Sequence, residues 1–324
     1  MIQSIHLENF RNFEKADLCF DAKSVILCGA NGQGKSSLLE AIFYLANLRS
    51  FRTGRVQEMR KIGTEQMHIS SIMGEGNIKN RMELRLGVNE RKLWMNGNPV
   101  RKASEFIGHC NTVAFLPDDP EIIVGASSVR RRFMDMFISM TDREYFVNLQ
   151  RYASALKSRN VLIRSVQQDR HVLEAYHPVL AEFGSKIIER RFLYARILTD
   201  FMKQVLKEIR PELSDCEIKM RAVHELEDAE VYRKRLDASV QKDQEKGYTS
   251  FGPHLDDFDF ICSGKSLRNY GSRGQCRVVS FALKMAGFDI LNSCSRSPEK
   301  TIVMVDDATG DLDERAKNAF LDKI

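Results

Sequence analysis

The chain has 324 residues, 43% of them hydrophobic and 29% charged, with a net charge of +5 at pH 7, which excludes a disordered or collagen-like protein and is typical of a globular one with one or two domains. The sequence contains no run of 18 apolar residues and no signal-peptide core, so we expect no membrane span and no membrane partner. The seven cysteines form no C-x-x-C pair, which indicates reduced thiols and a cytoplasmic location.

Three strands are expected before residue 29. Residues 2–10 alternate roughly between apolar and polar side chains, and residues 16–20 are expected to pair with them. Residues 24–28 read Ser-Val-Ile-Leu-Cys, which predicts a short buried strand that leads into the following loop.

That loop carries a phosphate-binding motif. Residues 29–36 read Gly-Ala-Asn-Gly-Gln-Gly-Lys-Ser, the pattern G-x-x-x-x-G-K-[ST], and residues 36–47 have the apolar side of a helix. Glycines let backbone N–H groups converge on phosphates at a helix N-terminus. We expect Lys35 to reach the β- and γ-phosphates of ATP and the Ser36 hydroxyl to bind Mg²⁺. The predicted ATP-binding residues here are Gly29, Ala30, Asn31, Gly32, Gln33, Gly34, Lys35, Ser36 and Ser37.

Strand character gives way to helical character near residue 119. Residues 82–88 and 91–95 flank an Asn-Glu turn and predict a hairpin. Beyond them, glycines become rare and helical periodicity dominates. The predicted helices are 129–140, 143–166, 171–209 and 229–246.

The order of these elements predicts an α/β architecture with a split core. Strand character returns at residues 258–262, so residues 119–246 are expected to form an inserted helical lobe. The core would then consist of residues 1–118 and 247–324. A coiled-coil root is the alternative for the lobe, although its heptads are not sustained.

A second anion-binding pattern precedes the last predicted helix of the core. Residues 272–275 read Ser-Arg-Gly-Gln, and residues 276–288 have an amphipathic helical pattern. A hydroxyl, a glycine N–H and a helix N-terminus can together bind an anion. An ordinary N-cap is the alternative for such a turn.

An acidic strand completes the predicted site. Residues 301–307 are an apolar run that ends in Asp306 and Asp307. Beside a phosphate loop, Asp306 is expected to hold Mg²⁺ and Asp307 to act as the catalytic residue that polarises the attacking water. Paired acids also occur at ordinary strand ends, which is the alternative.

Phosphate loop, Ser-x-Gly-Gln helix, acidic strand and Gly-Asp-Leu-Asp at residues 310–313 follow one another in the order of ABC-type ATPases. In that class the signature helix caps the γ-phosphate bound by the other subunit, so ATP is sandwiched in a homodimer. The predicted signature residues, acting on the partner's ATP, are Ser272, Gly274 and Gln275.

Further segments resemble the RecF family of bacterial recombination-mediator ATPases. They are spread along nearly the whole chain, and their order and spacing carry the resemblance more than any one segment except the phosphate loop. The matching segments are 7–12, 48–53, 95–97, 113–119, 130–135, 152–160 and 248–254.

This resemblance implies an ABC-type ATPase head with mixed β subdomain, phosphate-loop core and inserted α-helical lobe. It also implies weak ATPase activity with ATP and Mg²⁺, an ATP-dependent homodimer, and binding to gapped DNA or single-/double-strand junctions. RecO and RecR are the implied partners in loading RecA during DNA repair and replication. Arg11, which follows the first strand, would pack on the nucleotide.

Clustered basic residues are candidate DNA contacts, although a solvated face explains each cluster equally well. The clusters are Arg49, Arg52 and Arg55; Arg60 and Lys61; residues 130–132; and Arg190 with Arg191.

Three departures from the RecF pattern stand out. Leu255 follows Gly-Pro-His where the family has Arg, and Arg273 and Cys276 replace two glutamines of the signature. The family pattern continues beyond residue 324, so the resemblance implies a C-terminally incomplete or unusually short chain.

Two rival functions stay open: the ATPase subunit of an ABC transporter, and a non-hydrolysing, ATP-gated DNA-binding module.

Overall fold

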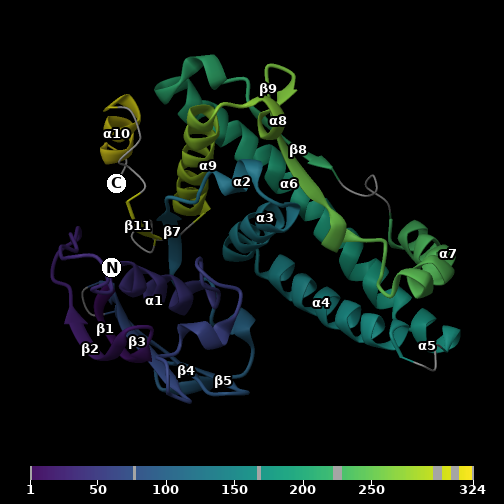
Figure 1. Ribbon diagram of the computed structural model, residues 1–324, viewed down its shortest axis with the longest axis horizontal. Helices are drawn as coiled ribbons and strands as arrows, with labels where there is room; N and C mark the ends of the chain where they lie inside the picture. Colours follow the sequence, from purple (N-terminus) through teal and green to yellow (C-terminus); the bar gives the residue numbers. More distant parts are fainter. Residues whose placement is uncertain are drawn as a thin grey trace. The chain divides into compact units, whose positions relative to one another are not determined.

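The computed structural model describes residues 2–75, 78–165, 169–221, 228–294, 301–307 and 314–322. The chain divides into two compact units (Figure 1). The first unit contains Met1–Pro117, Phe288–Asp311 and Ile324, and the second contains Asp118–Gly287 and Leu312–Lys323.

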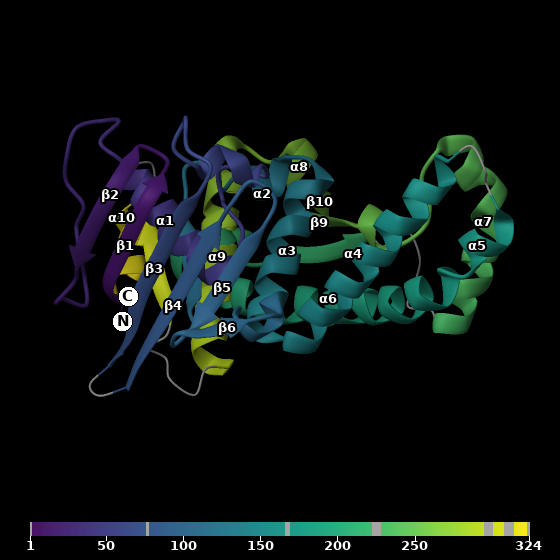
Figure 2. The same ribbon diagram turned by 90° about the horizontal axis from the view of Figure 1, so that it is seen from below.

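The first unit contains a six-stranded antiparallel sheet, with the order β2-β1-β3-β4-β5-β6 (Figure 2). Leu7, Ile69 and Leu84 lie opposite one another on the face that packs against helix α1 (Lys35–Asn47), and all three are buried. The predicted first two strands and the hairpin are confirmed. The strands are β1 (Ile2–Phe10), β2 (Phe13–Cys19), β3 (Met67–Glu75), β4 (Ile78–Leu86), β5 (Arg91–Met95) and β6 (Asn98–Val100).

A separate two-stranded parallel sheet joins distant parts of the first unit. Strand β7 (Asn111–Phe115) pairs with β11 (Thr301–Val305), in a register that sets Val303 opposite Val113. All five residues of β7 are buried, and α1 packs against this strand. The predicted acidic strand is therefore confirmed, and it lies beside the helix that follows the phosphate loop.

The strand predicted at residues 24–28 is wrong. This segment is irregular, and the side chains of Val25 and Ile26 are 49% and 87% exposed. An apolar run becomes a strand only where a neighbouring strand accepts its backbone hydrogen bonds. Within the described residues, no strand pairs with this segment.

Helices make up most of the second unit, and α6 with 33 residues packs against α4 and α7. The helix predicted at 171–209 is two helices, because Pro178 fits only in the first turn and α6 therefore starts anew at His177. None of the described helices is long and apolar enough for a membrane span. The helices are α2 (Glu121–Val124), α3 (Ser127–Thr141), α4 (Arg143–Ile163), α5 (Arg170–Glu174), α6 (His177–Ile209) and α7 (Ala229–Lys246).

The second unit extends beyond the predicted end of the helical lobe at residue 246. Strand β8 (Glu217–Arg221), which the sequence analysis missed, pairs with β9 (Asp257–Cys262), and β9 pairs with β10 (Lys265–Ser266). This pairing holds the segment after residue 247 in the second unit as far as Gly287. The remaining helices are α8 (Leu267–Tyr270), α9 (Arg273–Cys294) and α10 (Glu314–Leu321), with 3-10 turns at Val56–Met59, Ala103–Glu105, Pro211–Leu213 and Pro253–Leu255.

Buried arginines strengthen this association. Arg130 on α3 makes a two-pronged ion pair with Asp257, and Arg191 on α6 pairs with Asp135 and Asp256. Both guanidinium groups are at most 2% exposed. Arg130 and Arg191 therefore belong to neither a solvated face nor a DNA-contacting cluster, and removal of either one would leave a carboxylate without its partner inside the fold.

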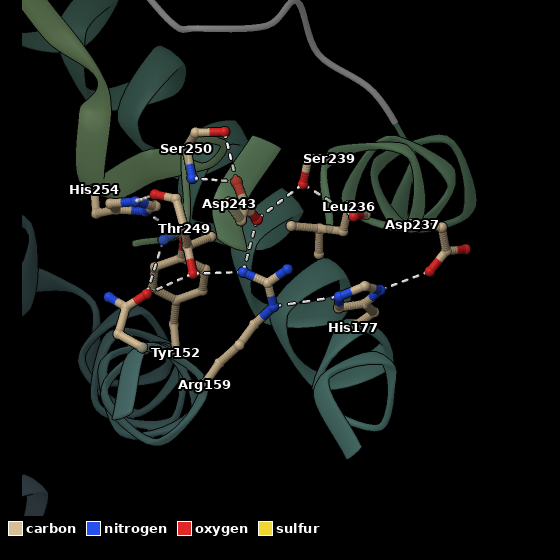
Figure 3. A network of polar contacts seen from close by, with 11 residues as sticks. Tyr152, Arg159, His177, Leu236, Asp237, Ser239, Asp243, Thr249, Ser250 and His254 are labelled. Atoms are coloured by element: carbon tan, nitrogen blue, oxygen red, sulfur yellow. Dashed lines mark hydrogen bonds and ion pairs between the residues drawn. The ribbon is translucent and has the colours of Figure 1, made fainter. Parts of the chain in front are cut away.

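A third buried arginine organises the network in Figure 3. Arg159 on α4 pairs with Asp243 on α7 at 2.8 Å and donates a hydrogen bond to Thr249. Its Nε also donates to Nε2 of His177, so the ring proton of His177 lies on Nδ1, 2.6 Å from Asp237. Burial and the neighbouring Arg159 lower the pKa of His177, although Asp237 opposes the shift.

We expect the second unit to lose stability as the pH falls below about 6.5, the usual pKa of histidine. The unfolded chain binds a proton there that the folded His177 does not, so the free energy of unfolding falls with pH by at most about 1.4 kcal/mol per unit for one proton. Urea unfolding between pH 5.5 and 7.5 measures this slope. His177→Gln should reduce it, whereas His171→Gln, at a side chain that is 94% exposed, should not. Equal slopes in both variants would contradict the assignment.

Candidate nucleotide-binding site

The predicted phosphate loop lies at the N-terminus of α1, which begins at Lys35. Gly32 and Gly34 have φ angles of 81° and 100°, in the left-handed region that glycine tolerates best. A Cβ atom on Gly34 would come within 2.7 Å of the Phe13 ring and 2.8 Å of the Asn12 side chain. The side chains of Asn12 and Phe13 thus pack against the loop and leave room only for glycine at position 34.

Lys35 keeps its ammonium group within the loop. Its Nζ donates to the carbonyl oxygens of Gly29 at 2.7 Å and Ala30 at 3.0 Å. The loop from Gly29 to Gln33 is exposed. A phosphate group entering the loop would therefore meet a cation already placed beside the helix N-terminus.

Ser36 and Asp306 meet although they are 270 positions apart in the chain. The Ser36 hydroxyl donates to Oδ1 of Asp306 at 3.0 Å. Asp306 is placed by the parallel sheet, because its N–H donates to the carbonyl of Phe115 just beyond the last paired residues. A hydroxyl and a carboxylate at the head of a phosphate loop are oxygen ligands that suit Mg²⁺.

Asp307, the predicted catalytic residue, directly follows this contact. It is exposed, and its φ angle of 50° turns the chain sharply after β11. Asp306 and Asp307 thus have different surroundings, since only Asp306 contacts the phosphate-loop helix. The downstream residues Asp311 and Asp313 lie outside the described residues.

Arg11, which the family resemblance places against the nucleotide, makes an ion pair with Glu40 of α1 in this structure. Its guanidinium makes two hydrogen bonds to Glu40, at 2.8 and 2.6 Å, and one to the carbonyl of Glu58. Glu40 is fully buried and also accepts a hydrogen bond from Ser50. Arg11 thus joins the first strand to α1, and its contact with ATP stays a prediction.

Glu40 is the polar residue near the site that the sequence analysis missed. It lies within the apolar residues of α1, where a carboxylate needs a partner to be buried. Arg52, one of the candidate DNA contacts, lies 3.5 Å from it. A single glutamate inside an otherwise apolar helix is the signal that could have indicated this ion-pair cluster.

The predicted signature residues form a helix cap in the second unit. Ser272 Oγ accepts a hydrogen bond from the N–H of Gln275, and Gln275 Oε1 accepts one from the N–H of Ser272. This reciprocal pair is a capping box, and it starts α9 at Arg273, three residues earlier than predicted. Ser272, Gly274 and Gln275 are exposed. Their action on the ATP of a partner subunit stays a prediction.

Asp118 and Asp119 form a turn at the start of the second unit. The carbonyls of Asp118 and Asp119 accept hydrogen bonds from the first residues of α2. The buried side chain of Asp119 forms an ion pair with Lys284 on α9. His254 is likewise structural, since it is half-buried and its two ring nitrogens contact the Tyr152 hydroxyl and the Thr249 carbonyl.

The fold and the phosphate-loop site define an ATP-binding class of protein. The RecF/RecN/SMC N terminal domain matches residues 1–324. DNA replication and repair protein RecF of Lachnoclostridium phytofermentans is 32% identical over 329 residues, covering 100% of this chain and 90% of that protein. The corresponding protein of Thermoanaerobacter sp. strain X514 is 33% identical over 331 residues, covering 100% of this chain and 91% of the relative.

Solved structures of RecF are also similar to this chain in fold and in sequence. The recombination mediator protein RecF-ATP of the RecFOR pathway has a TM-score of 0.88 and 32% identity, covering 99% of this chain and 88% of that one. RecF-ATPrS of the same pathway has a TM-score of 0.85 and 31% identity, covering 100% and 89%. The chain belongs to the RecF family. Its expected ABC-type ATPase fold is thereby confirmed.

Gly34→Ala should weaken ATP binding at least about tenfold, because the new methyl group must displace the loop from Phe13 and Asn12. Backbone strain and crowding should also lower the free energy of unfolding by about 2–4 kcal/mol. Gly63→Ala is the matched control, since Gly63 has a similar φ of 85° and open space around it. Fluorescent-ATP titration and urea unfolding measure both effects, and equal behaviour of the two variants would refute this account of the loop.

Proposed function

We propose that the protein is an ATP-dependent DNA-binding protein of recombinational repair and replication. It would bind gapped DNA or single-/double-strand junctions as an ATP-induced dimer and assist the loading of RecA together with RecO and RecR. The observation that carries the nucleotide part is the contact of Ser36 with Asp306, which unites the two halves of an Mg²⁺–ATP site. The repair role rests on the RecF relatives and on the RecFOR pathway of the similar structures.

The residues of the site would divide the work in ATP binding. The loop N–H groups and Lys35 bind the phosphate tail, with Lys35 exchanging its contacts with Gly29 and Ala30 for phosphate oxygens. Ser36 and Asp306 would hold Mg²⁺, which neutralises phosphate charge when bound. Asp307 would orient the attacking water and accept its proton. Its short side chain favours the weak ATPase activity expected from the sequence.

The dimer would form through the exposed end of α9. Ser272, Gly274 and Gln275 present a hydroxyl, a glycine N–H and a helix N-terminus on the surface, which suits the γ-phosphate of ATP bound by a second subunit. Exposed arginines such as Arg55, at 84% exposure, are left as candidate contacts to DNA phosphates. The buried Arg130 and Arg191 are not among them.

Asp306→Asn and Asp307→Asn should have separable effects. Asp306→Asn removes a ligand charge beside Ser36, so Mg²⁺-dependent ATP binding should weaken at least about tenfold. Asp307→Asn should keep ATP affinity and slow hydrolysis about 10²–10⁴-fold. Equilibrium ATP binding and steady-state phosphate release distinguish the two. Equal losses in both variants would contradict these roles, and unchanged turnover in Asp307→Asn would favour a non-hydrolysing ATP-gated module.

Ser272→Arg should keep ATP binding but abolish the ATP-induced dimer and the ATP-stimulated retention of gapped DNA, because a bulky cation would occupy the facing surface. Ser293→Arg is the matched control, with the same change at an exposed serine near the other end of α9. Sedimentation with Mg²⁺–ATP and DNA retention at several salt concentrations measure both. If Ser272→Arg forms the ATP-induced dimer as the wild type does, the proposed signature role is wrong. If the wild-type protein co-fractionates with membranes and does not retain DNA, the transporter ATPase subunit is favoured instead.

A further inference from the structure

A second cluster of metal-ligating side chains lies away from the phosphate loop, on the large sheet. His6 and Glu8 on β1 and His68 on β3 each offer one ligand atom, and the three atoms lie within 4.8 Å of one another. In the part of the chain that the structure describes, this is the one group of three histidine, cysteine or acidic side chains so close together. The cluster takes no part in the proposed ATP site.

Strand register brings these residues to one face. Glu8 lies opposite His68, and His6 lies opposite Ser70 in the antiparallel β1–β3 pair. Their neighbours Leu7 and Ile69 point to the buried face against α1, so the alternation of strands directs the three ligands to the other face. The site is therefore built by pairing that the fold already requires.

Both imidazole rings are flanked by a carboxylate. Asp17 on β2 lies 2.6 Å from Nδ1 of His6, which leaves Nε2 of that ring as its free ligand atom. Glu83 on β4 lies 3.1 Å from Nε2 of His68, while Nδ1 of His68 lies 4.0 Å from Glu8. Histidines that bind metal ions commonly have a carboxylate at the other ring nitrogen, which fixes the tautomer and the ring orientation.

His68 has an unused hydrogen-bonding atom. Its Nε2 is buried and makes no hydrogen bond of acceptable geometry, although Glu83 is close. Such an unsatisfied group is costly. A metal ion at Nδ1 would place the ring proton on Nε2, where Glu83 at 3.1 Å could accept it.

We propose that His6, Glu8 and His68 bind one divalent transition-metal ion of the Zn²⁺ type, with water as the fourth ligand. Two imidazoles and one carboxylate are a ligand set that Zn²⁺ accepts, whereas Mg²⁺ prefers oxygen ligands alone. Ligands of tetrahedral Zn²⁺ lie about 3.3 Å apart, so the three ligand atoms, now within 4.8 Å of one another, would have to move closer together around the ion, and the exposed Glu8 side chain has room to do so. The ion would link β1 to β3 from the face opposite α1.

The test uses the full chain with excess Mg²⁺, which saturates the Ser36–Asp306 site, and titrates Zn²⁺ or Co²⁺. The wild type should bind one equivalent, with Co²⁺ giving visible tetrahedral bands and no thiolate charge-transfer band. His6→Gln, Glu8→Gln and His68→Gln should each weaken binding at least about tenfold, and Asp17→Asn about 10–100-fold. His171→Gln, at an exposed histidine near Glu174, should bind like the wild type.

Several outcomes would overturn the proposal. A thiolate charge-transfer band would place the ion at a cysteine, such as the exposed Cys19 on the neighbouring strand β2, and would reject the proposed ligands. Unchanged affinity in Glu8→Gln, whose side chain is half exposed, would also reject the site. ATP binding is measured in each variant to show that the fold is intact. Absence of Zn²⁺ binding by the wild type at micromolar concentration would refute the proposal outright.

Discussion

The parallel pairing of β7 with β11 is the constraint on which the proposed ATP site depends. The phosphate loop and its helix form from adjacent residues, but Asp306 reaches Ser36 only because β11 pairs with the fully buried β7. Since side chains alternate along a strand, a shift of one residue in this pairing would turn Asp306 away and bring a neighbour to Ser36. The register of five residue pairs thus decides which of two adjacent aspartates meets the loop.

Elements whose signals are local could be predicted from the sequence. The loop, α1, the hairpin and most helices follow from motif, periodicity or turn residues that lie within a few positions of one another. Residues 24–28 could not, because an apolar pentapeptide does not reveal whether a partner strand exists. The extent of the second unit could not be predicted for a similar reason: β8 and β9 are separated in sequence, and their pairing holds residues after 247 in that unit.

Buried charges were the other part that sequence reasoning could not reach. Arg130 and Arg191 stand in basic runs that suggest a surface, yet each is buried against aspartates far along the chain. Glu40 is likewise buried, and its ion-pair partner is Arg11. A charge is tolerated in the interior when its partner is close, and that partner is specified by the tertiary fold. Counting the basic residues or basic clusters of the sequence therefore overestimates the positively charged surface that is available to nucleic acid.

The capping box at the start of α9 places two chemical demands on one side chain. The helix needs an acceptor at residue 272, and the Ser272 oxygen supplies it to the N–H of Gln275. A phosphate bound as proposed would need a donor, and Ser272 Oγ still has its own hydroxyl hydrogen to donate because it acts only as the acceptor in the cap. An aspartate would cap the helix equally well but would repel an anion, while an alanine would do neither. A hydroxyl meets both demands, so under the proposed signature role this position would be restricted both by the folding of its own chain and by the phosphate of a second molecule.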